Sequence, residues 1–238
     1  MSGTVIAIDG SAASGKSTTA RAVAAALGFQ HLDSGALYRG VTLVALREAA
    51  ERGTAGDPLA ALEPETILRT AEAHGLMLQP DGHGFSAYLG GEPVDGEIRA
   101  ARVTAHVSAV SALPVVREWV NARLRAMVRA GMDVVVDGRD IGTVVFPDAA
   151  LKVFLTATPQ ARAERRLVQQ GDSAESGSVA HEAERLAARD RADSSRSLAP
   201  LRRAGDAVEV DTTNLDFPEQ VERIVALARA RPTGSTSG

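Results

Sequence analysis

The chain has 238 residues, of which 26 are basic and 30 acidic, and its formal net charge at neutral pH is −4. This balance argues against a general nucleic-acid-binding surface, because such surfaces normally carry a basic excess. Cysteine is absent, which excludes disulfides, thiolate metal sites and cysteine nucleophiles, and no apolar run reaches the length of a membrane span. We therefore expect a cytoplasmic protein without nucleic-acid or membrane partners, and we expect a monomer.

Strand and helix patterns alternate along most of the chain. Residues 4–9 are a short β-branched run that predicts a buried strand, residues 15–27 carry apolar residues at helical spacing, and residues 29–32 predict a second strand. The same reasoning predicts further helices at 36–52, 63–73, 97–112, 114–130, 158–170, 179–195 and 217–230, and strands at 132–137, 151–155 and 207–210. This alternation indicates an α/β fold in three layers, with helices on both faces of a central parallel sheet.

One segment interrupts the alternation. Residues 76–96 alternate apolar and polar side chains around Pro-Asp-Gly and Gly-Gly turns, which is typical of antiparallel hairpins. We therefore expect a small α+β insert at 63–100, inside a core formed by residues 1–62 and 101–230. Residues 231–238 are expected to form a disordered tail.

A phosphate-binding motif follows the first predicted strand. Residues 10–17 read GSAASGKS and fit the pattern G-x-x-x-x-G-K-[ST] at the start of a predicted helix, which is the context that gives the match meaning. One of only two lysines, Lys16, occupies the required position; its charge would lie at the β- and γ-phosphates, while the Ser17 hydroxyl would bind Mg²⁺. The motif predicts ATP binding by Gly10, Ser11, Ala12, Ala13, Ser14, Gly15, Lys16, Ser17 and Thr18.

Two further features narrow the function of this P-loop. The apolar strand ending at Asp137 resembles a Walker B strand and is followed at once by Arg139 and Asp140. Residues 162–203 are rich in arginine and predict a lid at about 160–197 that covers the phosphates and excludes water. Within this segment we expect a solvent-exposed face of ion pairs at Glu182, Glu184, Arg185, Arg202 and Arg203.

Together with the P-loop, two longer blocks resemble the cytidylate kinase family of the bacterial type. They read LDSGALYR at 32–39 and DGRDIGTVVFP at 137–147, and the resemblance covers residues 4–230, the hairpin insert included. It implies a P-loop NTPase-type fold, a CMP-binding insert and transfer of the ATP γ-phosphoryl group to CMP or dCMP, with Mg²⁺. Because the acceptor is already an anionic phosphate, we expect catalysis by positioning and charge stabilisation, through Lys16, Arg139, Arg162 and Arg166.

The resemblance also implies which side chains bind the acceptor. The phosphate of the acceptor is assigned to Ser34, Arg39, Arg139 and Arg196. Its base is assigned to Ser108, Arg117 and Asp140, and its ribose side to Arg189 and Asp193. Tyr38 either stacks near the substrate or packs its own helix. The chemistry is consistent, because a carboxylate accepts from cytosine N4 while an arginine donates to N3 or O2.

Other readings of the same residues stay open. The acceptor could be UMP, AMP or a non-nucleotide such as shikimate, or the chain could be a regulatory module that binds nucleotide without transferring phosphate. Taken singly, Ser108 could be an ordinary helix serine, Arg117 a surface arginine and Asp140 a helix cap. The histidines, His31, His74, His83, His106 and His181, lack metal-ligand spacing and receive no role.

Overall fold

The computed structural model describes residues 3–53, 63–82, 84–171 and 176–230 and contains two compact units. The first unit comprises residues 1–32 and 128–238, and the second residues 33–127. The insert expected at 63–100 lies wholly within the second unit, and its role in substrate binding stays a prediction. The expected tail, 231–238, lies outside the described residues.

The first unit is built on a five-stranded sheet. Its strand order is β2 (Gln30–Asp33), β6 (Val134–Gly138), β1 (Val5–Gly10), β7 (Leu151–Thr156) and β8 (Val208–Asp211). Strand β1 pairs in parallel with both β6 and β7, and β7 pairs in parallel with β8. Every residue of β1 and β6 is buried, as expected of a parallel sheet covered on both faces. The α/β fold of the P-loop NTPase type is therefore confirmed.

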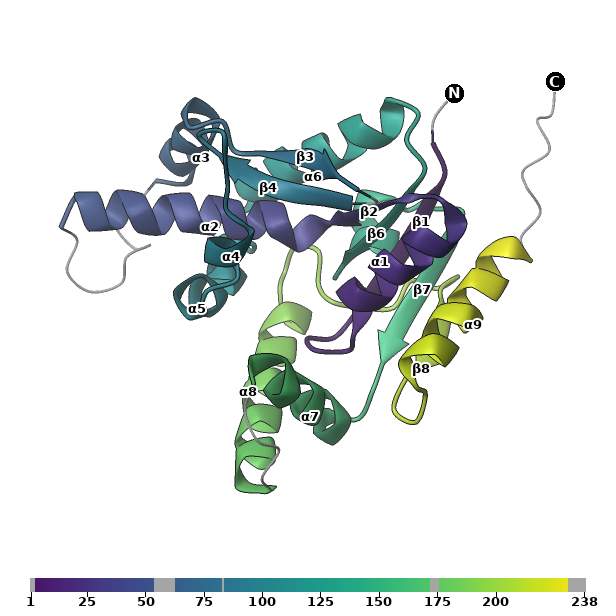
Figure 1. Cartoon of the computed structure of the whole chain (residues 1–238). Coiled ribbons are helices and arrows are strands. Elements are labelled where there is room, and N and C mark those ends of the chain that lie inside the picture. The colour runs from purple at the N-terminus through teal and green to yellow at the C-terminus, as the bar shows by residue number, and fades with distance from the viewer. Residues whose placement is uncertain (1–2, 54–62, 83, 172–175, 231–238) are drawn as a thin grey trace. The chain divides into compact units, whose positions relative to one another are not determined.

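Two helices cover one face of this sheet. Helices α1 (Lys16–Leu27) and α9 (Phe217–Arg229) lie side by side, α1 against β1 and β6 and α9 against β7 (Figure 1). Their shared core is aliphatic, because the chain is only 3% aromatic; it is formed by side chains such as Ile6, Ile8, Val23, Val153 and Ile224.

Helices α7 (Pro159–Gln170) and α8 (Ser176–Ser194) pack against each other within the first unit and cover most of the arginine-rich segment. Ala163 and Leu186 share a buried cluster with Ala12 of the P-loop. Glu182 precedes Leu186 by one helical turn and is only 4% exposed, so the prediction that it lies on a solvent-exposed face is wrong. Its carboxylate is compensated by the Arg185 guanidinium at 2.6 Å, with which it forms an ion pair.

In the second unit, the long helix α2 (Ser34–Glu51) packs against a small antiparallel sheet and several helices (Figure 1). The sheet has the order β3 (Met77–Asp81), β4 (Gly84–Leu89) and β5 (Glu92–Pro93), which confirms the hairpin and adds a third strand. The helices around α2 are α3 (Pro64–Ala73), α4 (Asp95–Ile98) and α5 (Ala101–Val110). Helix α6 (Pro114–Arg129) follows α5.

The helix predicted at 97–112 is in fact two helices. Ala100 has an extended backbone with ψ 154° and separates α4 from α5. Ile98, Val103 and Val107 are all buried, but the step from Ile98 to Val103 is five residues and departs from the helical spacing of three or four. The sequence analysis therefore predicted one helix where the backbone forms two. Across the described ranges, none of the helices has both the length and the apolar character needed to cross a membrane.

Candidate functional site

The P-loop turns from the end of β1 into the first turn of α1. Gly15 forms the N-cap of α1 with φ 84°, a left-handed conformation that glycine adopts without a steric penalty. No side chain caps this N-terminus, and no acidic residue lies in its first turn. The terminal N–H groups and the positive end of the helix dipole therefore suit an anion such as a phosphate.

Two side chains of the loop support the same interpretation. Lys16 is only 7% exposed, and its ammonium group donates a hydrogen bond of 3.0 Å to the Ser11 carbonyl oxygen. The Ser14 hydroxyl is fully buried and has no hydrogen-bond partner among the described residues. A buried hydroxyl without a partner is costly, and a bound phosphate oxygen would satisfy it.

Ser17 and Asp137 bring two oxygen ligands together. The Ser17 hydroxyl donates to Asp137 Oδ2 at 2.5 Å, because the parallel register places Asp137 of β6 beside Ile8 of β1, just before the P-loop. Burial raises the pKa of Asp137, but the hydrogen bond from His31 and the charge of Lys16 outweigh it and hold that pKa below its usual range. A hydroxyl and an ionised carboxylate fit Mg²⁺, which prefers oxygen ligands and shares its shell with substrate phosphates.

Asp9, at the end of β1, anchors a segment that sequence patterns did not predict. Residues Ile141–Val145 form one turn of π-helix, labelled η1, directly after Asp140. The two Asp9 oxygens accept hydrogen bonds of 2.8 Å from the backbone N–H groups of Ile141 and Gly142. Burial raises the pKa of Asp9 to about 6, although these two hydrogen bonds act in the opposite direction.

We expect Asp9→Asn to change how stability depends on pH. The raised pKa means that the folded chain holds the Asp9 proton more tightly than the unfolded chain does, because the pKa of Asp9 in the unfolded chain is near 3.8. The stabilisation from protonation is complete below about pH 4 and is lost as pH rises through 6, a difference of about 3 kcal/mol. Relative to the parent chain, the asparagine variant should therefore be less stable at pH 4 than at pH 7. Urea unfolding across this range measures the difference; a gap that is constant with pH would contradict the expectation.

Helices α7 and α8 contact the P-loop through a charged pair. The Ala12 N–H group donates to Asp190 Oδ1 at 2.9 Å, and the Ala12 carbonyl accepts from Arg162 Nη1 at 3.0 Å. Arg162 also forms a close ion pair with Asp190 Oδ2 and is only 6% exposed. In this conformation the Arg162 guanidinium therefore binds the backbone of the loop itself. Its predicted catalytic role, like that of the half-buried Arg166 one turn later, stays a prediction.

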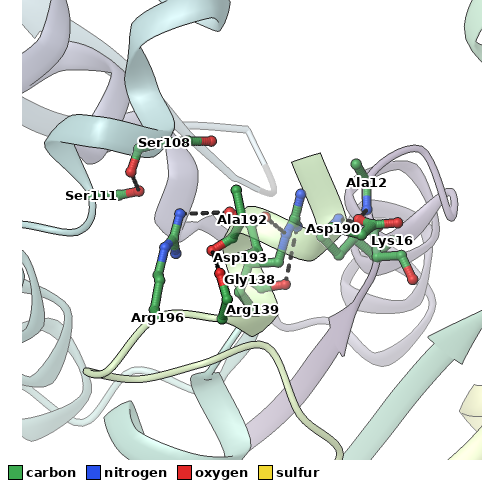
Figure 2. A network of polar contacts seen from close by, with 12 residues as sticks. Ala12, Lys16, Ser108, Ser111, Gly138, Arg139, Asp190, Ala192, Asp193 and Arg196 are labelled. Atoms are coloured by element: carbon green, nitrogen blue, oxygen red, sulfur yellow. Dashed lines mark hydrogen bonds and ion pairs between the residues drawn. The ribbon is translucent and has the colours of Figure 1, made fainter. Parts of the chain in front are cut away.

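A second charged cluster joins α8 to the segment after β6. Figure 2 shows the Asp193 carboxylate between Arg139 and Arg196. Asp193 Oδ2 accepts from Arg139 Nε at 3.0 Å, while Oδ1 accepts from Arg196 Nη2 at 2.5 Å. Asp193 is 2% exposed, so its charge is buried and paired twice. Arg139 Nη1 also donates to the Gly138 carbonyl at 3.4 Å, which ties this guanidinium to the end of β6. The half-buried Arg189 lies on the same helix.

The second unit contains its own group of predicted residues. Arg117 of α6 is 3% exposed, which rules out a surface arginine; Nη1 donates to the Ser111 carbonyl at 3.1 Å, and the guanidinium lies 5.6 Å from the centre of the Tyr38 ring. The half-buried Ser108 lies on α5, and its carbonyl accepts from the Ser111 hydroxyl at 3.2 Å. This unit therefore holds a polar cluster in which Tyr38 packs against an arginine.

Ser34 and Arg39 lie on the first two turns of α2. Ser34 is the first residue of the helix and is buried. Arg39 Nη1 donates to the Ile98 carbonyl at 3.1 Å and to the Thr104 hydroxyl at 2.9 Å, so this guanidinium also links α2 to α4 and α5. Binding of the acceptor phosphate by these two residues stays a prediction.

Asp137, Asp190 and His31 belong to these clusters although they were not among the predicted site residues. Asp137 had a signal, since it ends the strand that resembles Walker B. Asp190 contacts a residue 178 positions away, and His31 pairs with Asp137 across 106 positions; neither has a local pattern that would reveal it. The alternative reading of Asp140 as a helix cap is not supported: Asp140 occupies the N-cap position of η1, but its side chain forms no capping hydrogen bond there.

The comparisons with known proteins identify the family of this chain. The family model described as cytidylate kinase matches residues 6–230. A cytidylate kinase of Streptomyces griseus is 41% identical over 231 residues, covering 97% of this chain and 94% of the relative. Cytidylate kinases of Mycolicibacterium paratuberculosis and Geobacillus kaustophilus are 42% and 41% identical, each covering 95% of this chain and 96% of the relative. The chain therefore belongs to the cytidylate kinase family and is a nucleoside monophosphate kinase.

Proposed function

We propose that this chain transfers the γ-phosphoryl group of ATP to CMP or dCMP, producing ADP and CDP or dCDP. The observation that supports ATP as the phosphoryl donor is the uncapped N-terminus of α1 behind the P-loop, with Lys16 and Ser17 in its first turn. The family membership supports CMP or dCMP as the phosphoryl acceptor, because the relatives that cover nearly the whole chain are cytidylate kinases.

In the proposed reaction, an oxygen of the acceptor phosphate forms a bond to the γ-phosphorus of ATP, and the bond from that phosphorus to the β–γ bridging oxygen breaks. The acceptor oxygen is already anionic, so no protein base has to remove a proton. Lys16 would stabilise negative charge on the β- and γ-phosphates, and Arg139 and Arg196, fixed by Asp193, would hold the acceptor phosphate in line. Ser17 and Asp137 would hold Mg²⁺, which when bound screens the charge of the ATP phosphates.

The family resemblance assigns recognition of the cytosine ring to two buried side chains. Asp140 is 4% exposed and Arg117 is 3% exposed. A carboxylate accepts a hydrogen bond from the N4 amino group of cytosine, and a guanidinium donates to N3 or O2. Uracil presents an acceptor at position 4 and a donor at position 3, so it would leave both buried groups poorly paired. Such a mismatch normally costs a factor of about 10² or more in kcat/KM.

A panel of acceptors tests this function. Release of ADP from ATP is followed with CMP, dCMP, UMP, AMP and shikimate under identical conditions. We expect CMP or dCMP to exceed UMP in kcat/KM by about 10²-fold. Asp140→Asn should narrow this ratio, because an amide can donate to the uracil O4 atom; Asp148→Asn, at an exposed position shortly after η1, is the matched control. Faster phosphorylation of UMP or AMP would refute the cytosine assignment, and absence of ADP release with every acceptor would favour a non-catalytic nucleotide-binding module.

A further inference from the structure

A buried histidine contacts the carboxylate that accepts the Ser17 hydrogen bond. His31 lies on β2, which is next to β6 in the sheet, and it is only 3% exposed. Its Nε2 atom lies 2.7 Å from Asp137 Oδ1, while Asp137 Oδ2 accepts the hydrogen bond from the Ser17 hydroxyl. Three side chains from β2, β6 and α1 therefore form one continuous hydrogen-bonded chain, and all three lie in the first unit.

The direction of each hydrogen bond in this chain follows from its chemistry. An ionised carboxylate can only accept, so Nε2 of His31 must carry the proton that it shares with Asp137. The Ser17 hydroxyl donates its only proton to the other carboxylate oxygen, which leaves the lone pairs of the Ser17 oxygen for a different partner. A carboxylate with only one oxygen bound could rotate about its terminal bond; with both oxygens bound, Asp137 is held in one orientation.

We propose that His31 is a positioning residue of the nucleotide site: it holds Asp137 so that the Ser17 oxygen is presented to the divalent cation that accompanies ATP. This inference rests on the proposed function and extends it to a residue that acts through Asp137. Residues that orient a metal ligand through hydrogen bonds normally contribute a factor of 10 to 100 in metal affinity. A histidine that only filled space between β2 and β6 would contribute nothing to that affinity.

Two substitutions separate positioning from packing. His31→Leu keeps an apolar side chain of moderate size but removes the donor to Asp137, while His31→Gln retains an N–H donor at comparable reach. The primary measurement is the Mg²⁺ concentration at which ADP binding is half-maximally enhanced, determined by calorimetry without catalysis. We expect a roughly 10-fold increase for His31→Leu and a value within about 3-fold of the parent chain for His31→Gln. ADP affinity in the presence of EDTA, and KM for CMP, should be unchanged in both.

Failure of the inference differs from failure of the proposed function. If ADP binding by the parent chain does not respond to Mg²⁺, the proposed function and the inference both fall. If it responds and His31→Leu responds equally, the proposed function stands and His31 is a packing residue only. If His31→Leu does not fold, His31→Asn replaces it, because this shorter polar side chain stops short of Asp137; equal Mg²⁺ responses of His31→Asn and His31→Gln would then overturn the inference.

Discussion

Replacing Lys16 by alanine should reduce kcat for phosphoryl transfer by about 10³-fold or more while the fold is retained. The ammonium group lies in the first turn of α1, and its hydrogen bond to the Ser11 carbonyl holds it within the P-loop. In phosphoryl transfer the protein contributes mainly by stabilising charge that develops on the migrating group, so loss of a cation placed there has a large effect. Rates of ADP formation with saturating ATP and CMP, measured together with circular dichroism, check this result.

Two controls make the Lys16 result specific. Lys16 is largely buried, so the alanine variant also loses packing by the aliphatic stem; Lys16→Met keeps most of that stem and should be as inactive as the alanine variant. Arg21→Ala removes an exposed positive charge from the same helix and should stay within about 2-fold of the parent chain. Near-native turnover by a folded Lys16→Ala variant would remove the basis of the proposed mechanism.

Replacing Arg196 by lysine should lower kcat/KM for CMP by about 10- to 100-fold although the charge is conserved. Arg196 donates to Asp193, and a planar guanidinium binds a phosphate through two N–H groups in a fixed fork. A lysine ammonium is a compact group that cannot reproduce this fork while also reaching Asp193. Arg139→Lys should behave similarly, because Arg139 donates to the other oxygen of the Asp193 carboxylate.

Arg202→Lys is the matched control for these substitutions. Arg202 is exposed and lies only six residues after Arg196, so the same chemical change there should alter kcat/KM by no more than about 2-fold. Thermal unfolding of all three variants shows whether the buried cluster around Asp193 has been disrupted. Equal effects at Arg196 and Arg202, with equal stability, would mean that the abundance of arginine reflects composition rather than function.

The contact between Asp190 and Ala12 is relevant to how these variants are interpreted. The Asp190 carboxylate accepts a hydrogen bond from the backbone N–H group of Ala12 in the P-loop. Arg162 forms an ion pair with Asp190 and also donates to the Ala12 carbonyl. The P-loop is thus held at both polar groups of Ala12 by the helices predicted to form the lid. Substitutions at Arg162 therefore affect loop geometry as well as charge, and they report on catalysis less directly than substitutions at Lys16.

Local sequence patterns were enough to predict the P-loop, the order of helices and strands, and the family. The spacing of Gly10, Gly15, Lys16 and Ser17 after a β-branched run identified the P-loop, because a phosphate-binding turn needs these residue types in consecutive positions. Helix and strand order followed from periodicity, because each element buries its own apolar face. The two sequence blocks that resemble the cytidylate kinase family led to a family assignment that the comparisons confirmed.

Only the tertiary structure decided which distant side chains meet. The strand order β2-β6-β1 brings His31 to Asp137 and Asp137 to Ser17, and the packing of α8 brings Asp190 to Ala12. Periodicity describes one element at a time and contains no information about such pairs. The break at Ala100 is a related case, because the sequence analysis predicted one helix there and the backbone forms two. Residue type and spacing specify local chemistry, whereas burial and pairing of charges depend on the whole fold.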